Sequence, residues 1–325
     1  MTKPDVLVMA TNTANLVPWL EADYSLHRYD LSEDPDTLLD EVGERITAVV
    51  TTGAKGFSEA QLDKLPQVGI VACSGVGYDP IDVEACSSRG VVVTNTPDVL
   101  TDDVADLAIG LMISSRRNMI VGDAHVRSGD WGRKGMMGLT SSLKGKRLGI
   151  VGLGRIGSAI ARRSEPMGLV VGYCTRTKRD NAYHYDPDVE ALAAWSEILI
   201  VSIPGTPETE RVIDREVIEA VGPDGTLINI SRGSVVDEPA LISALQSGAL
   251  DSAGLDVYLN EPNPNPAFRE LENVVLYPHH ASGTVETRNA MARLVVDNLA
   301  AYFAGEPPIT PVNSVPANAA AVAPS

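Results

Sequence analysis

The sequence predicts an α/β protein with two domains, each built on a doubly wound parallel sheet. Short apolar runs, typical of buried parallel strands, alternate with segments of helical periodicity along almost the whole chain. A glycine-rich turn, VGLGRIG at 151–157, separates one such run from one such helix. The length of 325 residues suggests about two domains.

The first α/β unit is predicted at the N-terminal end of the chain. Strands are expected at 6–9, 48–51 and 70–72, and helical segments near 59–65 and 81–88. The alternation of strands and helices indicates a single sheet with helices on its faces.

A second unit begins at Pro97 with a long helical stretch at 102–115. A polar, glycine-containing passage at 122–145 follows and is expected to leave the sheet as an excursion. Strands are then expected at 147–151, 169–173, 198–203, 226–230, 252–255 and 274–276, and helices at 156–167, 189–194, 215–220 and 238–246. This succession predicts the second doubly wound parallel sheet.

The last helical segment, 284–304, has no predicted strand nearby and ends at two prolines. We therefore predict that it returns the chain to the first unit. On this prediction, residues 1–98 and 284–312 form one discontinuous domain, and residues 99–283 form a second domain inserted within it. The Ala- and Pro-rich tail at 313–325 is predicted to be disordered.

Composition indicates a soluble protein whose partners are small molecules. The net charge of −17 and the pI near 4.7 argue against binding to nucleic acid or to an anionic membrane, although a local basic pocket is compatible with them. Cys73, Cys86 and Cys174 are too few and too scattered for a disulfide framework or a zinc site, and no other metal site is suggested. With no signal peptide and no membrane-spanning apolar run, the expected location is cytoplasmic.

The glycine-rich turn predicts that the chain binds a dinucleotide. Gly152 permits a tight turn out of the strand, Gly154 lets the backbone approach a pyrophosphate, and Gly157 lets the next helix pack close to the sheet. The helix is predicted to begin at Ile156, and its N-terminal N–H groups would face the phosphates. Arg155 and Ile156 are therefore also predicted to contact the cofactor. Such a motif is weak evidence when alone, and here its position between a strand and a helix supports it.

The end of the next strand predicts which dinucleotide is bound. Cys174 stands where NAD-binding proteins usually place an acid, and a cysteine neither accepts strong hydrogen bonds from the ribose nor repels a phosphate. The residues that follow, Thr175, Arg176, Thr177, Lys178 and Arg179, offer hydroxyl groups and positive charge to a 2′-phosphate. NADPH is therefore favoured over NADH. The alternative is that this run is only a solvated surface loop.

Three further segments carry reactive residues at the C-terminal ends of predicted strands. They are INISRGSVVDE around Arg232, GLDVYLNEP around Glu261 and YPHHASGT around His279. Open α/β sheets bind ligands at this end, so the three side chains are expected to converge. Reduction of a 2-oxo acid needs a cation for the carboxylate and carbonyl, which Arg232 supplies, and a proton donor, which His279 supplies. Glu261 would orient the imidazole and favour its protonated form.

With these segments, the chain resembles the D-isomer-specific 2-hydroxy-acid dehydrogenase family over almost its whole length. The sequences NTPDVLTDDVADLAIGL at 95–111 and PHHASGTVETR at 278–288 resemble in particular its NADPH-dependent glyoxylate, hydroxypyruvate and hydroxyphenylpyruvate reductases. The resemblance implies a Rossmann nucleotide domain inserted in a discontinuous flavodoxin-like substrate domain. It also implies that Arg232 binds substrate, that His279 is the acid/base, and that Glu261 is the partner of His279.

The resemblance implies further contacts for the substrate and for a second subunit. The substrate carboxylate is expected on backbone N–H groups of a loop formed by Ser74, Gly75, Val76 and Gly77. The passage at 122–145 is expected to embrace a second subunit, so a homodimer is implied.

Further cofactor contacts are expected from residues close to the ends of later strands. The resemblance makes Asp256 a contact for the nicotinamide carboxamide, and we also predict cofactor contacts at Ile203, Pro204 and Thr209.

Several residues keep alternative interpretations. His280 could be the acid instead of His279, although the family places its base directly after the proline. Arg232 could pair with a surface acid, and Glu261 could be a turn residue. Gly75 and Gly77 could serve only the backbone of a turn. A substrate pocket or an apolar interface could equally be formed by Trp131, Met136 and Met137.

The predicted reaction is the NADPH-dependent reduction of glyoxylate or hydroxypyruvate to a D-2-hydroxy acid. Hydroxyphenylpyruvate or 2-ketogluconate is the alternative substrate. A different class is a corepressor-like protein that senses nicotinamide cofactors, because relatives of this fold have that function. The presence of Arg232, Glu261 and His279 together disfavours a purely binding function.

Overall fold

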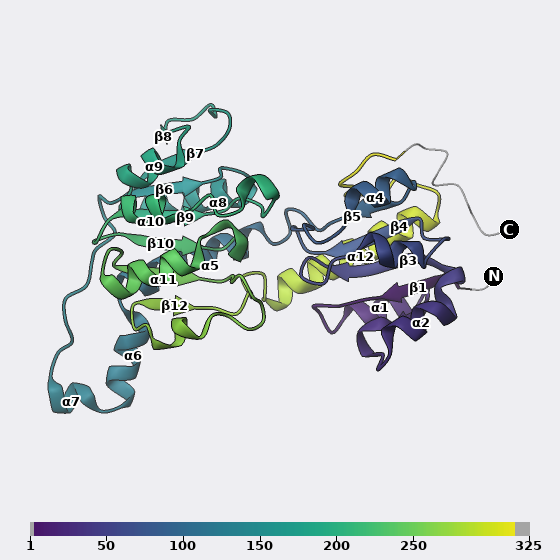
Figure 1. Cartoon of the computed structure of the whole chain (residues 1–325), viewed down its shortest axis with the longest axis horizontal. Helices are drawn as coiled ribbons and strands as arrows, with labels where there is room; N and C mark the ends of the chain where they lie inside the picture. The colour runs from purple at the N-terminus through teal and green to yellow at the C-terminus, as the bar shows by residue number, and fades with distance from the viewer. Residues whose placement is uncertain (1–2, 316–325) are drawn as a thin grey trace. The chain divides into compact units, whose positions relative to one another are not determined.

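The computed structural model of the chain describes residues 3–315 and divides into two compact units (Figure 1). Among the described residues, unit 1 comprises 3–100 and 282–315, and unit 2 comprises Thr101–Ala281. Each unit has one fully parallel sheet covered by helices, with five strands in unit 1 and seven in unit 2. The predicted fold class is therefore confirmed.

The sheet of unit 1 has the strand order β2-β1-β3-β4-β5. Its strands are β1 (Asp5–Val8), β2 (Ser25–Arg28), β3 (Ile46–Thr52), β4 (Ile70–Ser74) and β5 (Val92–Thr94). This is the doubly wound order of flavodoxin-like proteins, in which ligands bind beyond the carboxyl ends of the strands. The sequence did not predict β2 and β5, which are the two edge strands.

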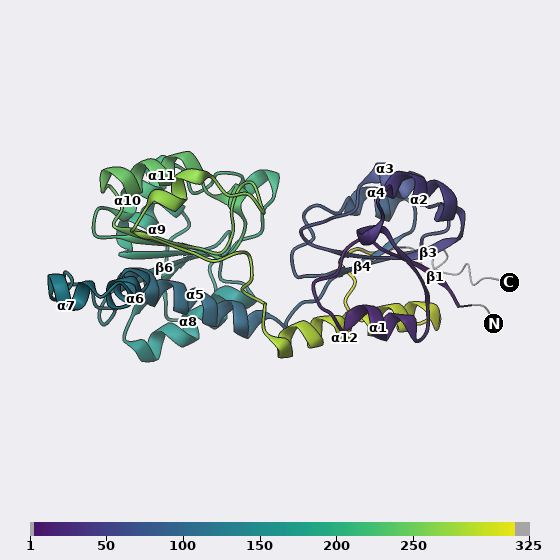
Figure 2. The same ribbon diagram turned by 90° about the horizontal axis from the view of Figure 1, so that it is seen from below.

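Side chains that alternate along the strands of unit 1 build one apolar core on each face of the sheet. Leu7 and Val49 belong to the core under α2 (Pro35–Val42), α3 (Glu59–Asp63) and α4 (Val83–Ser88). Their neighbours Val6 and Val50 belong to the core under α1 (Leu16–Glu21) and α12 (Val285–Phe303). Figure 2 shows these two helical layers on opposite faces of the sheet.

The chain after α12 stays in contact with the sheet of unit 1. Pro311 bridges to Thr94, the last residue of β5. The predicted disordered tail starts at Asn313, yet the Asn313 side chain accepts a hydrogen bond from the Val93 N–H (2.8 Å) and donates one to the Val91 carbonyl (3.0 Å). Asn313 is thus part of the folded unit, because its carboxamide pairs with an edge strand. Residues 316–325 of the predicted tail lie outside the described residues.

The sheet of unit 2 has the strand order β12-β11-β10-β9-β6-β7-β8. Its strands are β6 (Arg147–Val151), β7 (Val170–Cys174), β8 (His184–Tyr185), β9 (Ile198–Val201), β10 (Thr226–Asn229), β11 (Ser252–Leu255) and β12 (Val274–Leu276). Read from β8, the first six strands follow the order of a Rossmann sheet, with β12 added at the far edge. The strand order reverses between β6 and β9, and ligands bind at such a switch point.

Helices cover both faces of the unit 2 sheet (Figure 2). One face carries α9 (Val189–Trp195), α10 (Arg215–Val221) and α11 (Glu238–Ser247), and the other carries α5 (Thr101–Arg116) and α8 (Arg155–Ser164). The helix predicted at 156–167 ends as α8 at Ser164 and continues as one 3₁₀ turn, Glu165–Met167.

The predicted excursion at 122–145 contains α7 (Asp130–Lys134) and most of α6 (Met119–Arg127), which begins before it. They follow α5 and extend away from the unit 2 sheet (Figure 1). Across residues 3–315, no helix combines the length and the apolar character needed to cross a bilayer.

Candidate active site

The glycine-rich turn at the end of β6 has the geometry of a dinucleotide cradle. Gly152 has φ +94°, and a Cβ at this position would lie 2.6 Å from Ile203 Cγ2. A Cβ on Gly157 would lie 2.0 Å from the Gly152 carbonyl oxygen, so only glycine lets α8 pack this closely. A Cβ on Gly154 would meet nothing within 4 Å. The structure therefore needs glycine at Gly152 and Gly157 for its own packing, whereas Gly154 borders open space that a pyrophosphate would fit.

The segment after β9 lies directly against this turn. Ser202 Oγ donates a hydrogen bond to the Gly152 carbonyl (2.7 Å), and Ile203 contacts Gly152 as described above. Further along, Thr209 Oγ1 donates to the Pro204 carbonyl (2.7 Å) and closes a short 3₁₀ turn. The predicted cofactor residues Ile203, Pro204 and Thr209 thus form one ordered segment, which begins beside the glycine turn.

Cys174 ends β7 beside the same turn, where its carbonyl accepts a hydrogen bond from the Gly152 N–H (2.9 Å). Burial raises the pKa of the Cys174 thiol, and Asp186 and Asp188 add smaller contributions. The thiol therefore carries no negative charge at neutral pH that would repel a phosphate.

The loop after Cys174 exposes its basic side chains. Thr175 Oγ1 donates to the Thr177 carbonyl (2.8 Å), which folds the loop back on itself, and Arg176, Lys178 and Arg179 are exposed. A hydrogen bond from Thr206 lowers the pKa of Glu208, and the charge of Arg176 contributes to the same direction. Arg176 is therefore close enough to act on Glu208, which lies in the segment that follows β9.

Arg232 follows β10 in a turn that fixes its backbone. Asn229 Nδ2 donates to the Arg232 carbonyl (2.9 Å), and one guanidinium nitrogen of Arg232 donates to the Ser231 carbonyl (2.7 Å). A Cβ on Gly205 would lie 2.8 Å from Arg232 Cγ, so glycine at 205 leaves the space in which this side chain lies. The arginine is placed beside the segment of the predicted cofactor contacts.

Glu261 and His279 form a hydrogen-bonded pair after β11 and β12. His279 Nδ1 and Glu261 Oε2 are 2.5 Å apart, and the second oxygen, Oε1, accepts the Tyr258 N–H (2.9 Å). Burial raises the pKa of Glu261, but the hydrogen bond with His279, the Tyr258 N–H and the charges of His279 and Arg232 together lower it below its ordinary value. Glu261 is therefore ionised at neutral pH, and Arg232 lies close enough to act on it.

The histidine sits in a constrained turn. His279 has φ +48°, a region that residues other than glycine rarely occupy, and its N–H donates to the Asp256 carbonyl (2.7 Å). This turn directs the Nδ1 atom toward Glu261 and leaves Nε2 as the ring nitrogen available for a substrate. The neighbouring ring of His280 is 6.2 Å from the Tyr277 ring and is not the imidazole that pairs with Glu261.

Asp256 supports this turn from a buried position. Its side chain accepts the N–H groups of His280 (2.8 Å) and Ala281 (3.2 Å), and the residue is 1% exposed. Burial raises the pKa of Asp256 to about 6, although the two N–H groups and the charge of His279 act in the opposite direction. The residue expected to contact the nicotinamide carboxamide thus also holds the backbone beyond His279.

Three residues that the sequence did not single out join the site segments to one another. A Cβ on Gly233 would lie 2.0 Å from the Tyr258 carbonyl carbon, so the glycine after Arg232 allows the two segments to touch. Tyr258 Oη donates to the Tyr277 carbonyl (2.9 Å), and buried Glu238 accepts the Leu259 N–H (3.1 Å). The motif RGSVVDE contained two of them, but only the fold shows what they contact.

The predicted substrate loop lies in unit 1, directly after β4. Ser74 is 1% exposed, and its hydroxyl donates to Asn12 Oδ1 (2.9 Å). The Gly75 N–H donates to the Cys73 carbonyl (3.2 Å). Val76 and Gly77 are half-buried, and their N–H groups donate no hydrogen bond to any acceptor among residues 3–315. Two of the predicted N–H donors are therefore available.

Residues 109–281 match the family described as D-isomer specific 2-hydroxyacid dehydrogenase, NAD binding domain. The chain belongs to this family. Across the described residues of this dehydrogenase, no group of three or more His, Cys, Asp or Glu side chains could hold a metal ion.

Relatives match the dehydrogenase over nearly their full length. Hydroxyphenylpyruvate reductase from Plectranthus scutellarioides is 48% identical over 308 residues, which are 94% of this chain and 98% of that protein. The 2-ketogluconate reductase of Gluconobacter oxydans is 43% identical, over 96% of this chain and 99% of that protein. A solved structure of an NADPH-dependent glyoxylate/hydroxypyruvate reductase from Sinorhizobium meliloti, in complex with NADP and malonate, has a TM-score of 0.88 at 41% identity and covers 96% of this chain and 97% of that chain.

These similarities make the chain an NAD(P)H-dependent dehydrogenase, as the sequence predicts. The residues of unit 2 fit a nicotinamide dinucleotide, because the glycine turn fits a pyrophosphate and the Arg232, Glu261 and His279 side chains gather at the same end of the sheet.

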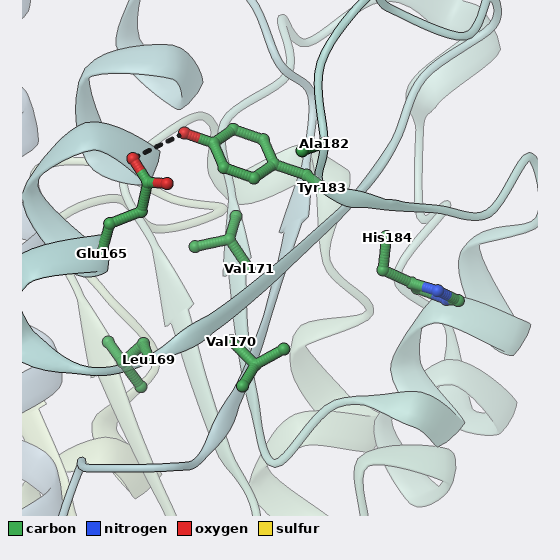
Figure 3. A pocket seen from close by; sticks show the side chains of 7 residues that line it. All are labelled: Glu165, Leu169, Val170, Val171, Ala182, Tyr183 and His184. Carbon is green, nitrogen blue, oxygen red and sulfur yellow. Dashed lines mark hydrogen bonds between the residues drawn. The ribbon is translucent and has the colours of Figure 1, made fainter.

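A separate hollow of about 420 Å³ lies at the edge of the unit 2 sheet (Figure 3). It is lined by Glu165, Leu169, Val170, Val171, Ala182, Tyr183 and His184. Tyr183 Oη donates to Glu165 Oε2 (3.0 Å), as the dashed line in Figure 3 shows. Val170 is the first residue of β7, whereas Cys174 at its other end borders the glycine turn. The hollow of the dehydrogenase therefore lies away from the carboxyl ends of the strands, and none of the predicted site residues lines it.

Proposed function

We propose that this dehydrogenase reduces small 2-oxo acids, foremost glyoxylate and hydroxypyruvate, to D-2-hydroxy acids with NADPH as hydride donor. The observation that carries the proposal is the His279–Glu261 contact of 2.5 Å in a site that Arg232 also borders. Reduction of a 2-oxo acid requires a cation for the substrate carboxylate and carbonyl, and a proton donor. Arg232 provides the cation, and the imidazole of His279, oriented by Glu261, provides the proton.

Each of the three side chains has one task in the proposed reaction. Arg232 binds the substrate carboxylate and polarises the C2 carbonyl, because a guanidinium donates two parallel hydrogen bonds. His279 donates a proton from Nε2 to the carbonyl oxygen. Glu261, ionised and bonded to Nδ1, holds the ring in place and stabilises its protonated form. The bound nicotinamide supplies the hydride that reaches C2.

The proposed cofactor contacts all lie in unit 2. Gly152, Gly154, Arg155, Ile156 and Gly157 would hold the pyrophosphate at the start of α8. Contacts from the later segments are proposed for Ile203, Pro204, Thr209 and Asp256.

The preference for NADPH is proposed from the end of β7. Cys174 is uncharged there, and Thr175, Arg176, Thr177 and Lys178 offer donors and positive charge to a 2′-phosphate. Arg176→Ala should raise the KM for NADPH about tenfold while leaving that for NADH within about twofold. The exposed Arg215 on α10 provides a matched control as Arg215→Ala. Equal losses with both cofactors would show that the loop does not bind the phosphate.

For the substrate carboxylate, we propose the loop formed by Ser74, Gly75, Val76 and Gly77 in unit 1, which has available N–H groups at Val76 and Gly77. The solved relative from Sinorhizobium meliloti contains malonate, a dicarboxylate, which fits a family that binds small carboxylic acids.

A panel of 2-oxo acids assayed with both cofactors tests the proposed function. Glyoxylate and hydroxypyruvate should show the highest kcat/KM with NADPH, with hydroxyphenylpyruvate and 2-ketogluconate as the alternatives that the relatives' names suggest. Failure of all four acids to oxidise NADPH would contradict the proposal.

A homodimer is proposed from the apolar side chains of the excursion. Trp131, Met136 and Leu139 are 56%, 82% and 104% exposed, and exposed apolar groups of this kind mark contact surfaces. Met137 instead packs near Gly122 within the excursion. A cytoplasmic location stays a prediction from the sequence.

A further inference from the structure

Three side chains and one backbone N–H group of unit 1 hold the carbonyl groups of the loop at 74–77, called the 74–77 loop below. Every carbonyl oxygen of this loop accepts a hydrogen bond. The donors are Asn12 Nδ2 to Ser74 (3.0 Å), the Thr96 N–H to Gly75 (2.9 Å), Asn95 Nδ2 to Val76 (2.9 Å) and Cys73 Sγ to Gly77 (3.8 Å). The loop therefore has one backbone conformation that the surrounding unit determines.

This arrangement leaves N–H groups without an internal acceptor. Within residues 3–315, the N–H groups of Val76 and Gly77 make no hydrogen bond, while the carbonyl groups on either side of them are engaged. Successive backbone N–H groups held in this way bind anions, since they offer partial positive charge without a compensating acceptor. Fixing them in advance removes the cost of ordering the loop when the anion binds.

Asn12 makes the most complete of these contacts. Its Nδ2 donates to the Ser74 carbonyl, and its Oδ1 accepts the Ser74 hydroxyl at 2.9 Å. Both ends of one carboxamide thus hold the first residue of the loop, across 62 positions of sequence. Asn12 lies between β1 and α1, a segment to which the proposed reaction assigns nothing.

The second side-chain anchor, Asn95, belongs to a larger structural network. It is 8% exposed, its N–H donates to the Thr310 carbonyl (3.3 Å), and its carbonyl accepts the Thr310 hydroxyl (2.6 Å). A substitution at Asn95 would disturb the contact of β5 with the C-terminal segment as well as the loop. Asn12 is therefore the anchor that isolates the effect on the loop.

We propose that Asn12 is a positioning residue for substrate binding, which holds Ser74 so that the Val76 and Gly77 N–H groups bind the carboxylate of the 2-oxo acid. The inference rests on the proposed function. Asn12 acts through the loop and leaves proton donation by His279 and hydride transfer unchanged, so its loss weakens carboxylate binding rather than the chemical step.

Asn12→Ala separates these effects in a kinetic experiment. The KM for glyoxylate or hydroxypyruvate should rise about tenfold while kcat stays within about twofold and the Kd for NADPH is unchanged. The dissociation constant for malonate, a carboxylate that the enzyme cannot reduce, should rise by the same factor as KM.

Asn15→Ala is the matched control. Asn15 stands in the same segment, but its carboxamide donates to Asn289 Oδ1 on α12 (2.6 Å) instead of the loop. This variant should have the kinetic constants of the unchanged protein. Ser74→Ala removes only one of the two hydrogen bonds to Asn12 and should raise KM by a smaller factor. If Asn12→Ala does not fold, Ser74→Ala is measured in its place.

The outcomes distinguish this inference from the proposed function. A protein that oxidises NADPH with none of the 2-oxo acids contradicts the proposed function, and malonate binding by calorimetry then still compares Asn12→Ala with Asn15→Ala. Equal malonate affinities in these two variants, or a fall in kcat or in NADPH affinity as large as the rise in KM, would overturn the inference.

Discussion

At the residue scale, the site depends on a carboxylate that has two different partners. One oxygen of Glu261 binds the His279 ring and the other binds the Tyr258 N–H, so the carboxylate cannot rotate away without losing both contacts. The lowered pKa of Glu261 keeps it ionised throughout the neutral range, where it stabilises a protonated imidazole.

Replacement of this carboxylate should change the pH dependence of reduction. Glu261→Gln removes the negative charge that stabilises the protonated ring of His279. The proton donor is then lost at a more acid pH than in the unchanged protein. We expect kcat/KM to fall about 10²-fold and the alkaline limb of the pH profile to move toward acid. The exposed Glu270, as Glu270→Gln, is the control. A profile that keeps its shape in Glu261→Gln would reject the pair.

Asp256 predicts a pH dependence of stability with a definite sign. Its pKa is about 6 in the folded chain against an ordinary value of 3.8, so the folded state keeps the proton at a pH where the unfolded chain has lost it. The resulting stabilisation is complete below the ordinary pKa and is lost as the pH rises through about 6. Asp256→Asn does not titrate. The free energy of unfolding of the unchanged protein, relative to this variant, should therefore fall by about 2 kcal/mol from about pH 4 to about pH 7.

Urea unfolding of both proteins at the two pH values measures this difference. A difference that is constant with pH would show that Asp256 titrates alike in the folded and unfolded chains.

The residues that could be predicted from sequence are those whose motifs are local. Arg232 precedes a glycine and His279 follows a proline, so each can be recognised within its own segment. Asn12 and Tyr258 could not be predicted, because their contacts are made with the 74–77 loop and with Tyr277, which are close only in the fold.

At the element scale, the same principle explains which strands could be predicted. β1, β3 and β4 consist mainly of buried apolar residues, and the sequence predicts all three. β2 has the sequence SLHR with no buried residue, and β8 has only two residues, so neither of these two strands has an apolar pattern. Their pairing with a neighbouring strand, rather than their composition, makes them strands. β5 is buried, but its three residues are too short a run to be recognised as a strand from sequence.

The glycine turn gives a prediction that separates packing from cofactor binding. A Cβ at 154 meets nothing, so Gly154→Ala should keep the melting temperature of the cofactor-free protein while raising the Kd for NADPH at least about tenfold. A Cβ at 157 collides with the Gly152 carbonyl, so Gly157→Ala should lower the melting temperature itself. Thermal unfolding and cofactor titration of the two variants measure both effects. Equal melting temperatures, or unchanged cofactor affinity in Gly154→Ala, would contradict this assignment.

At the scale of the whole molecule, the excursion is the part of unit 2 to which the proposed reaction assigns no task. α6 and α7 follow α5 and lie away from the sheet of unit 2 (Figure 1). The apolar side chains of Trp131, Met136 and Leu139 in the excursion are exposed. Coverage by a second copy would remove this apolar area from water.

Charged substitutions in the excursion test the proposed homodimer. Met136→Glu with Leu139→Glu should convert a dimer into a monomer in sedimentation velocity, because burying two carboxylates at an apolar contact is costly. Leu31→Glu, at another exposed leucine, is the control. If the unchanged protein is a monomer, the proposed homodimer is wrong. If the double variant stays dimeric, the contact between the subunits lies outside the excursion.

We propose above that NADPH reduces a 2-oxo acid in a site formed by Arg232, Glu261 and His279. The kcat/KM of Arg232→Ala for glyoxylate tests this most directly. We expect a loss of about 10³-fold with an unchanged Kd for NADPH and an unchanged melting temperature, because the guanidinium acts on the substrate. A kcat/KM close to that of the unchanged protein would contradict the claim.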